Sequence, residues 1–304
     1  EDVTEALAPG LREVGLVTSA LWTDVDGDGW LDLLVATEWG QVRYFNNREG
    51  RAFVDQTEAA GFATGGTGWW TALAAADFNG DGRMDYVVGN VGLNTQYRAS
   101  PEHPALLFSG DFGGSGRPPL IEAYYEGGRL VPWRTRKALA SAVPSVLRKF
   151  PNNDAYAQAS LGEILGEDRL AKARRYAATE LRSGVFLSGP DGRFHFEALP
   201  HLAQIAPVQG LLAGDFDGDG KADIYAVHNS YAPIPVIGRF DGGLSLLLRG
   251  DGRGRFTPAA HAASGLVVPG DAKALALVDL GDDGRPDFLV TRNNSTTLAF
   301  RNGG

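Results

Sequence analysis

The sequence predicts an all-β protein, a β-propeller of four-stranded blades with a small α-helical insertion. The first observation is a nine-residue acidic motif that recurs along the chain, each time followed by a short β-rich run. The second is the count of 41 glycines among 304 residues, which fits many tight turns between short strands. A four-stranded sheet cannot bury both faces alone, and stacking such sheets around an axis solves this.

The motif reads DVDGDGWLD at Asp24–Asp32. It returns as DFNGDGRMD at Asp77–Asp85, DFDGDGKAD at Asp215–Asp223 and DLGDDGRPD at Asp279–Asp287. Positions one, three, five and nine carry carboxylate or amide oxygens, and position six is glycine, except that position three of the last copy is Gly281. Such oxygens suit Ca²⁺, which takes about six to eight of them, so we expect three calcium sites and a possible fourth.

An EF-hand begins in the same way but requires a bidentate Glu at position twelve and a helix on each side. Position twelve is Val35, Val88 and Ala226 in the first three copies, and the flanking runs are too short for helices. We therefore interpret the motifs as calcium loops that join two strands, with the Asp at position nine replacing the missing Glu.

The chain order predicts five strand–loop–strand hairpins, with first loop residues Asp24, Asp77, Asp111, Asp215 and Asp279. The Asp111 loop has lost most of its ligand pattern. A helical insertion at 136–181 interrupts this third repeat, and Gly184–Leu199 is expected to supply its outer strands. We expect one domain over residues 1–304, either a five-bladed ring or part of a larger one.

Residues 1–11 echo Val54–Phe62, so we expect the chain to open inside the last strand of a preceding unit. The start at Glu1, without a Met, suggests an excised or processed piece of something longer.

The composition narrows the function classes. A formal charge of −9 argues against a nucleic-acid partner, and the absence of cysteine excludes disulfides and thiol chemistry. No apolar run of about 18 residues predicts a membrane span, and no signal peptide is visible. Weak calcium loops fit millimolar calcium, so we expect an extracellular, cell-surface or periplasmic location.

The three complete loops, each followed by a hydrophobic strand, resemble the FG-GAP/VCBS repeats of integrin-α-like β-propellers. The segment from DFGGSGRPPLIEAYYEGG through YAQASLGEILG to ALPHLAQIAP resembles bacterial secreted proteins related to cartilage acidic protein and the ASPIC/UnbV group. This resemblance implies a calcium-stabilised extracellular propeller. The biochemical role of the bacterial subgroup is largely unassigned.

The resemblance also implies the calcium ligands. Side-chain ligands are expected at the acidic and amide positions, and the backbone carbonyl at position seven of each complete loop is expected to add one oxygen. The full set is Asp24, Asp26, Asp28, Trp30, Asp32, Asp77, Asn79, Asp81, Arg83, Asp85, Asp215, Asp217, Asp219, Lys221, Asp223 and, for the weaker fourth loop, Asp279, Asp283 and Asp287.

The turns opposite the calcium loops carry polar and aromatic residues that are candidates for a ligand-binding face. The alternative is that Asn caps turns and Trp packs between blades. The candidates are Glu38, Trp39, Asn90, Asn94, His228, Asn229, Tyr231, Asn293 and Asn294.

The preferred functional hypothesis is a non-catalytic module that binds an extracellular protein or glycan, as in cell adhesion, or assembles with other domains or subunits. The sequence contains no nucleophile elbow, P-loop or H-E-x-x-H motif. Propeller enzymes gather their sites from separate blades, so a polysaccharide-acting lyase or hydrolase at the channel mouth stays the alternative. A purely architectural subunit is a third possibility.

Overall fold

The computed structural model describes residues 2–114, 116, 118–233 and 238–303. The chain divides into two compact units, which are treated separately below. The first comprises the chain up to Gln96 and from Leu181 onward, and the second is Tyr97–Glu180. The segment that interrupts the repeats is thus longer than the 136–181 expected from sequence. No helix in the described ranges is long and apolar enough to cross a membrane.

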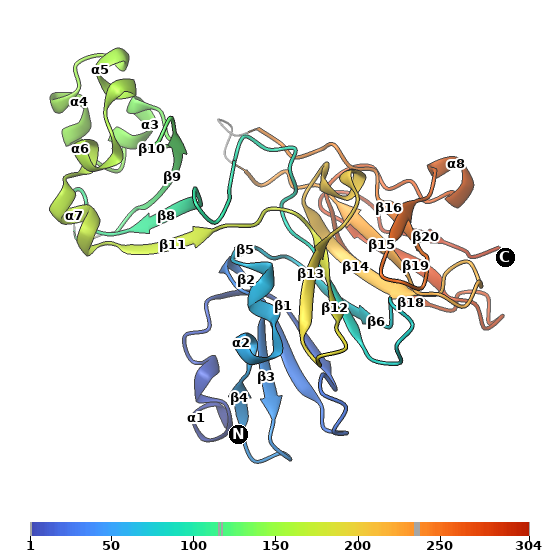
Figure 1. Ribbon diagram of the computed structural model, residues 1–304. Coiled ribbons are helices and arrows are strands. Elements are labelled where there is room, and N and C mark those ends of the chain that lie inside the picture. The colour runs from blue at the N-terminus through green and yellow to red at the C-terminus, as the bar shows by residue number, and fades with distance from the viewer. Residues whose placement is uncertain (1, 115, 117, 234–237, 304) are drawn as a thin grey trace. The chain divides into compact units, whose positions relative to one another are not determined.

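The first sheet of unit one runs β1-β2-β3-β4 and is antiparallel, with β5 pairing β2 at its far end (Figure 1). Its strands are β1 (Leu16–Thr23), β2 (Asp32–Gly40), β3 (Arg43–Asn47), β4 (Phe53–Asp55) and β5 (Gly68–Trp69). Before it lie α1 (Thr4–Leu7) and η1 (Pro9–Leu11), and after it α2 (Thr57–Ala60) and η2 (Phe62–Gly65). The echo between the chain start and Val54–Phe62 is therefore a repeated helical turn, and the strand expected at the start is wrong.

The second sheet corrects the predicted order of repeats. It runs β13-β12-β7-β6, from β6 (Leu73–Ala76), β7 (Asp85–Val88), β12 (Gly184–Ser188) and β13 (Phe194–Ala198). Phe186 of β12 pairs with Tyr86 of β7, although the whole inserted unit lies between them in the sequence. Gly184–Leu199 therefore completes the second repeat, because its outer strands resume only after unit two ends.

The third and fourth sheets follow the first pattern. The third runs β14-β15-β16-β17 and the fourth β18-β19-β20. Their strands are β14 (Val208–Gly214), β15 (Asp223–His228), β16 (Leu246–Gly250), β17 (Phe256–Pro258), β18 (Ala272–Val278), β19 (Asp287–Arg292) and β20 (Leu298–Phe300), with η3 (His201–Gln204) before β14 and α8 (His261–Ser264) before β18.

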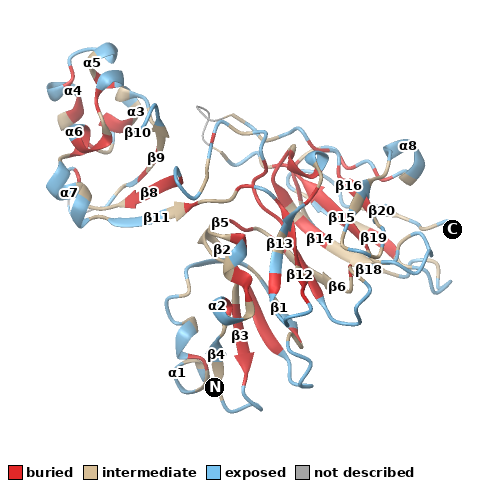
Figure 2. Cartoon of the chain, in the orientation of Figure 1, coloured by how far each residue is buried: buried red, intermediate tan, exposed pale blue. Residues whose placement is uncertain are grey.

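Consecutive sheets of unit one pack face to face around apolar cores (Figure 2). Leu34, Trp70 and Phe186 lie in the core shared by the first two sheets, and Val87 with Leu248 in the next. The second strands β2, β7 and β15 are buried along most or all of their length because both of their faces are covered.

The first strands of neighbouring sheets approach closely through small residues. A Cβ added to Gly210 of β14 would lie 3.5 Å from Ala274 of β18, and one added to Gly89, which follows β7, would lie 2.7 Å from Val208 of β14. This is the close approach expected near the axis of stacked blades. The described pairings give an all-β repeat fold of mostly antiparallel sheets but do not close it into a ring.

Unit two is a separate sheet covered by short helices. The sheet runs β10-β9-β8-β11, and Leu106, Ile121, Leu139, Leu161 and Ile164 form its core with the helices. The elements are β8 (Ala105–Ser109), β9 (Leu120–Glu126), β10 (Arg129–Pro132), α3 (Arg136–Ala140), α4 (Ser145–Lys149), α5 (Asn153–Gln158), α6 (Leu161–Leu165), α7 (Glu167–Lys172) and β11 (Arg174–Ala178).

The hairpin after Asp111 therefore belongs to this inserted sheet and not to the row of repeat sheets. The expected count of five blade-like repeats is corrected to four in the described chain, because β8 and β9 pair only with β10 and β11.

Candidate calcium loops

Each motif joins the first strand of a repeat sheet to the second, as predicted, since β2, β7, β15 and β19 all begin at position nine. The Asp at position one folds the loop around its carboxylate. Asp24 accepts hydrogen bonds from the N–H groups of Gly27 and Asp28 on Oδ1 and of Gly29 on Oδ2, at 2.8, 3.2 and 2.9 Å. Gly27 and Gly29 have φ of 77° and 87°, which favours glycine there.

The same three hydrogen bonds recur in the second and third loops. Asp77 accepts from Gly80, Asp81 and Gly82, and Asp215 accepts from Gly218, Asp219 and Gly220. Positions three and five then each accept one N–H two residues further on, as Asp26 does from Asp28, and Asp28 from Trp30. The peptide N–H groups of Trp30, Arg83 and Lys221 are thus all donated to position five.

The Asp at position nine is buried in all four loops and ties the loop to the third strand. Asp32 is fully buried, and its Oδ2 accepts from Val25 N–H and Tyr44 Oη while its Oδ1 accepts from Asn47 N–H. Asp85 and Asp223 make equivalent bonds to position two and the third strand, and Asp287 accepts from Leu280 N–H at position two and from Asn302 N–H just after β20. Burial raises the pKa of Asp32, Asp85 and Asp223 despite these hydrogen bonds.

Two of the loops bring carboxylate oxygens into a cluster that could hold a metal ion. In the described residues, oxygens of Asp24, Asp26 and Asp28 lie within 4.8 Å of one another, and so do those of Asp215, Asp217 and Asp223. The donor set is all oxygen, which fits Ca²⁺ and not a soft metal. Three carboxylates this close repel one another unless a cation lies between them.

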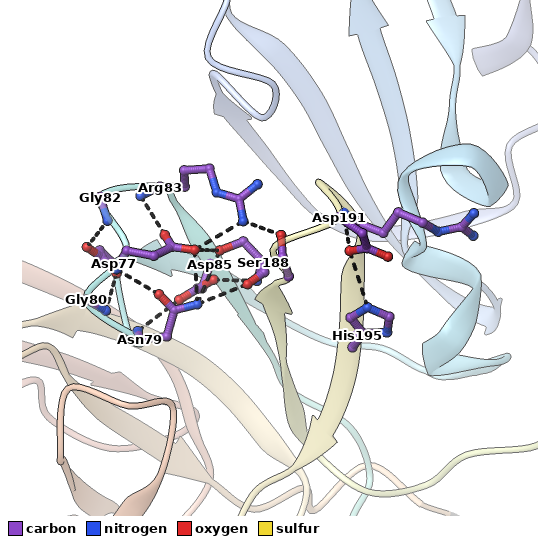
Figure 3. A network of polar contacts seen from close by, with 12 residues as sticks. Asp77, Asn79, Gly80, Gly82, Arg83, Asp85, Ser188, Asp191 and His195 are labelled. Atoms are coloured by element: carbon purple, nitrogen blue, oxygen red, sulfur yellow. Dashed lines mark hydrogen bonds and ion pairs between the residues drawn. The ribbon is translucent and has the colours of Figure 1, made fainter.

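The second loop gathers a mixed set of oxygens (Figure 3). Asp77, Asn79 and Asp85 converge with Ser188 of β12, whose hydroxyl donates to Asp81 at 2.8 Å. The pKa of Asp81 is lowered, because hydrogen bonds from Arg83 and Ser188 outweigh the effect of burial. Asn79 accepts from Asp81 N–H and donates to Ser188, so its amide is shared between the loop and the third strand.

The fourth loop keeps the backbone arrangement with fewer oxygens. Asp279 accepts from Asp283 and Gly284 N–H, and Asp283 accepts from Arg285 N–H. Position three is Gly281, and position four is Asp282 with φ of 52°, where the other loops have glycine. A Cβ on Gly281 would meet the guanidinium of Arg301, so a cationic side chain lies where the other loops have an Asp or Asn side chain.

The residues predicted for a ligand-binding face are not all on a surface. Asn90, His228 and Asn229 are buried, so their side chains do not form an exposed face in this structure. The Asn229 amide bonds the backbone of Gly243 and Gly270, and Asn90 accepts from Trp69 and Val91 N–H. Asn90 and Asn229 follow the alternative in which Asn caps turns, whereas the two ring nitrogens of His228 are buried without a hydrogen-bond partner.

The remaining candidates lie nearer solvent. Glu38 and Trp39 are partly exposed, and the Trp39 ring packs on Trp69 at 4.7 Å. Tyr231 is 38% exposed and packs under Arg239. Asn94, Asn293 and Asn294 are exposed, although Asn94 donates to Ile205 and Asn293 donates to Asp271.

The third strand supplies residues that the motif did not reveal. Asn46 of β3 donates to Asp26 at 2.8 Å, and Arg249 of β16 forms an ion pair with Asp217 at 3.2 Å. The strand register could have identified these two residues. Each of them directly follows the third-strand residue that pairs with the residue just after position nine.

Comparison with known proteins supports the repeat. The family model described as FG-GAP-like repeat matches residues 24–88. No curated protein matches the chain.

Two solved structures are similar at low identity. The V. cholerae biofilm matrix protein Bap1 is 10% identical with a TM-score of 0.29, and the match covers 95% of this chain and 63% of that one. The exotype rhamnogalacturonan lyase YesX is 12% identical with a TM-score of 0.28, at 95% and 56% coverage. The chain thus spans less than two thirds of either protein, and its residues 24–88 carry an FG-GAP-like repeat.

Proposed function

We propose that this chain is a calcium-stabilised β-propeller module that works outside the cytoplasm and binds a protein or a glycan without catalysis. The FG-GAP-like match and the four motif loops support the repeat. The face-to-face sheets and closely packed first strands support stacking around an axis, whether in one ring or a larger one. We place the chain near the ASPIC/UnbV-associated secreted proteins on sequence resemblance.

The observation that carries the proposal is the repeated hydrogen-bond pattern of the loops. In the first three loops, backbone N–H groups fix the position-one carboxylate in a folded loop, which supports the proposal that this carboxylate is poised to bind a cation. Oxygens at positions three, five and nine and the position-seven carbonyl complete the proposed ligand set. Bound Ca²⁺ would neutralise acids that otherwise repel, which stabilises the fold.

Calorimetric titration of calcium into the chelator-treated protein tests the metal part of the proposal. We expect three ions per chain, since the fourth loop has lost its position-three oxygen. The variant Asp217→Ala should lower this number to two. Asp282→Ala is the matched control outside the ligand pattern and should leave it at three. No binding heat, or equal loss in both variants, would overturn the assigned ligands.

Binding of immobilised glycans and extracellular matrix proteins, in calcium and in EDTA, tests the recognition part. Retention that depends on calcium would support a binding module. Release of shortened polysaccharide during the assay would instead favour the lyase or hydrolase alternative, and absence of any retention would favour an architectural subunit.

A further inference from the structure

The loops differ in the residue that the third strand places against them. In each sheet the residue just after position nine pairs with a hydrophobic residue of the third strand, respectively Phe45, Phe186, Leu248 and Phe300. The next residue along the third strand is respectively Asn46, Leu187, Arg249 and Arg301. Sheets of one pattern therefore present an amide, an alkyl group or a guanidinium at the same place.

Asn46 is built into the first loop. Its side chain is 2% exposed, and its Nδ2 lies 2.8 Å from Asp26 Oδ2 and 3.1 Å from Asp32 Oδ1. The other amide atom, Oδ1, is buried with no hydrogen-bond partner. A buried acceptor without a partner is costly, so this amide is not fully satisfied by the protein alone.

The distances match those between neighbouring ligands of one calcium ion. Two oxygens that each lie about 2.4 Å from Ca²⁺ are about 3 Å apart when they occupy adjacent coordination positions. Rotating the amide by half a turn brings Oδ1 to the place that Nδ2 holds, beside Asp26 and Asp32. In the present orientation Nδ2 also lies 2.9 Å from Tyr44 Oη while Oδ1 has no partner, and a cation beside Asp26 would favour the turned amide, with Oδ1 as its ligand.

Arg249 has the opposite effect on the third loop. Its Nε lies 3.2 Å from Asp217 Oδ2, so a fixed positive charge already pairs with the position-three carboxylate. A calcium ion bound by Asp217 must either displace this guanidinium or lie next to its positive charge, because the guanidinium is always protonated. The same argument applies to Arg301, which lies beside Gly281.

We propose that this third-strand residue grades the calcium affinity of the loops, with the Asn46 amide oxygen acting as an additional ligand that makes the first site the tightest. Arg249 weakens the third site by competing for Asp217. This inference rests on the proposed calcium function, which it extends by one ligand from outside the nine-residue motif.

Terbium luminescence can report the first site alone. Tb³⁺ replaces Ca²⁺ at oxygen sites and emits when an adjacent tryptophan is excited. Trp30 stands at position seven of the first loop, whereas Arg83, Lys221 and Arg285 hold that position in the others. Titration of Tb³⁺, followed by displacement with Ca²⁺, gives the affinity of this site, and Trp30→Phe shows which part of the signal it carries.

Two variants of Asn46 distinguish a side chain that binds calcium from one that only donates hydrogen bonds to the loop. Asn46→Leu, which copies the second repeat, should weaken the first site about tenfold, as loss of a ligand-supporting group does. Asn46→Asp retains an oxygen but cannot donate a hydrogen bond to Asp26. Affinity kept or increased in Asn46→Asp supports the ligand role. Equal weakening in both variants, or no change in Asn46→Leu, overturns it.

The affinity of the third loop is measured by placing a tryptophan, which excites Tb³⁺, next to that loop. Lys221→Trp places a tryptophan at its position seven, and adding Arg249→Asn to that variant should tighten the new Tb³⁺ signal severalfold. Unchanged or weaker binding would overturn the competition by Arg249. Circular dichroism in EDTA verifies that each variant is folded. Absence of any terbium signal in the unaltered protein would count against the calcium function itself, which is a separate failure.

Discussion

The first and fourth loops have the same backbone arrangement but different chemistry. In both, the buried position-nine Asp accepts N–H groups from position two and from the end of the third strand or just beyond it, at 2.7–3.0 Å. The first loop adds a cluster of three carboxylates and the Asn46 amide, whereas the fourth has Gly281 and Arg301. The hydrogen bonds that shape the loop can therefore be present without all of the oxygens that would hold an ion.

The largest effect should come from removing position nine in either loop. Asp32→Ala and Asp287→Ala each leave buried N–H groups without an acceptor, and we expect each to cost roughly 2–4 kcal/mol of unfolding free energy in EDTA. Asp28→Ala, which removes an exposed ligand, should cost less than about 0.5 kcal/mol there. Denaturant unfolding measures all three, and a small effect for Asp287→Ala alone would break the comparison.

Stability should also depend on pH through His228, and this contribution must be separated from that of the loops. Burial lowers the pKa of His228 to about 4 from 6.5, and neither ring nitrogen has a hydrogen-bond partner. The unfolded chain therefore binds this proton more readily, so the contribution of His228 to stability is retained above pH 6.5 and falls by about 3 kcal/mol toward pH 4.

The variant His228→Leu should flatten this part of the stability–pH curve, measured by urea unfolding in EDTA. An unaltered slope between these two pH values would show that another group is responsible.

Loss of one complete site should have an intermediate effect. At a calcium concentration about 100 times the dissociation constant, a site contributes about 2.7 kcal/mol. Asp217→Ala should lose up to this amount in calcium and much less in EDTA. Asp282→Ala should lose little in either, and equal losses would contradict the positions assigned to ligands.

The smallest expected effect is a gain. Gly281→Asp restores the position-three carboxylate, but its side chain meets Arg301. We expect calcium to add less than about 1 kcal/mol to its stability. Combining it with Arg301→Leu should increase this gain, as read from melting curves. A larger gain in the single variant would show that Arg301 does not compete.

The sequence predicted what depends on residues close together in the chain. Asp32, Asp85, Asp223 and Asp287 could be placed at the start of a second strand because the glycine-containing loop and the β-rich run are contiguous. The all-β repeat architecture followed from repeating that unit, whereas the candidate ligands, taken from the same motif, stay a prediction.

What the sequence could not show depends on pairing across long separations. Phe186 pairs with Tyr86 although unit two separates them in the sequence, and no local pattern predicts this pairing. Asn46 and Arg249 reach the loops through strand register. Asn90, His228 and Asn229 lie within two residues of the ends of β7 and β15, and the local sequence does not show their burial, because contacts such as those of the Asn229 amide with Gly243 and Gly270 join residues far apart in the chain.

Thermal unfolding of the unaltered chain, in millimolar calcium and in EDTA, shows whether bound calcium stabilises the fold. The proposed loops require a cation to relieve their clustered carboxylates, so EDTA should lower the melting temperature markedly and added calcium should restore it. Coincident melting curves under the two conditions would contradict a stabilising metal and leave the acidic loops as hydrogen-bonded turns.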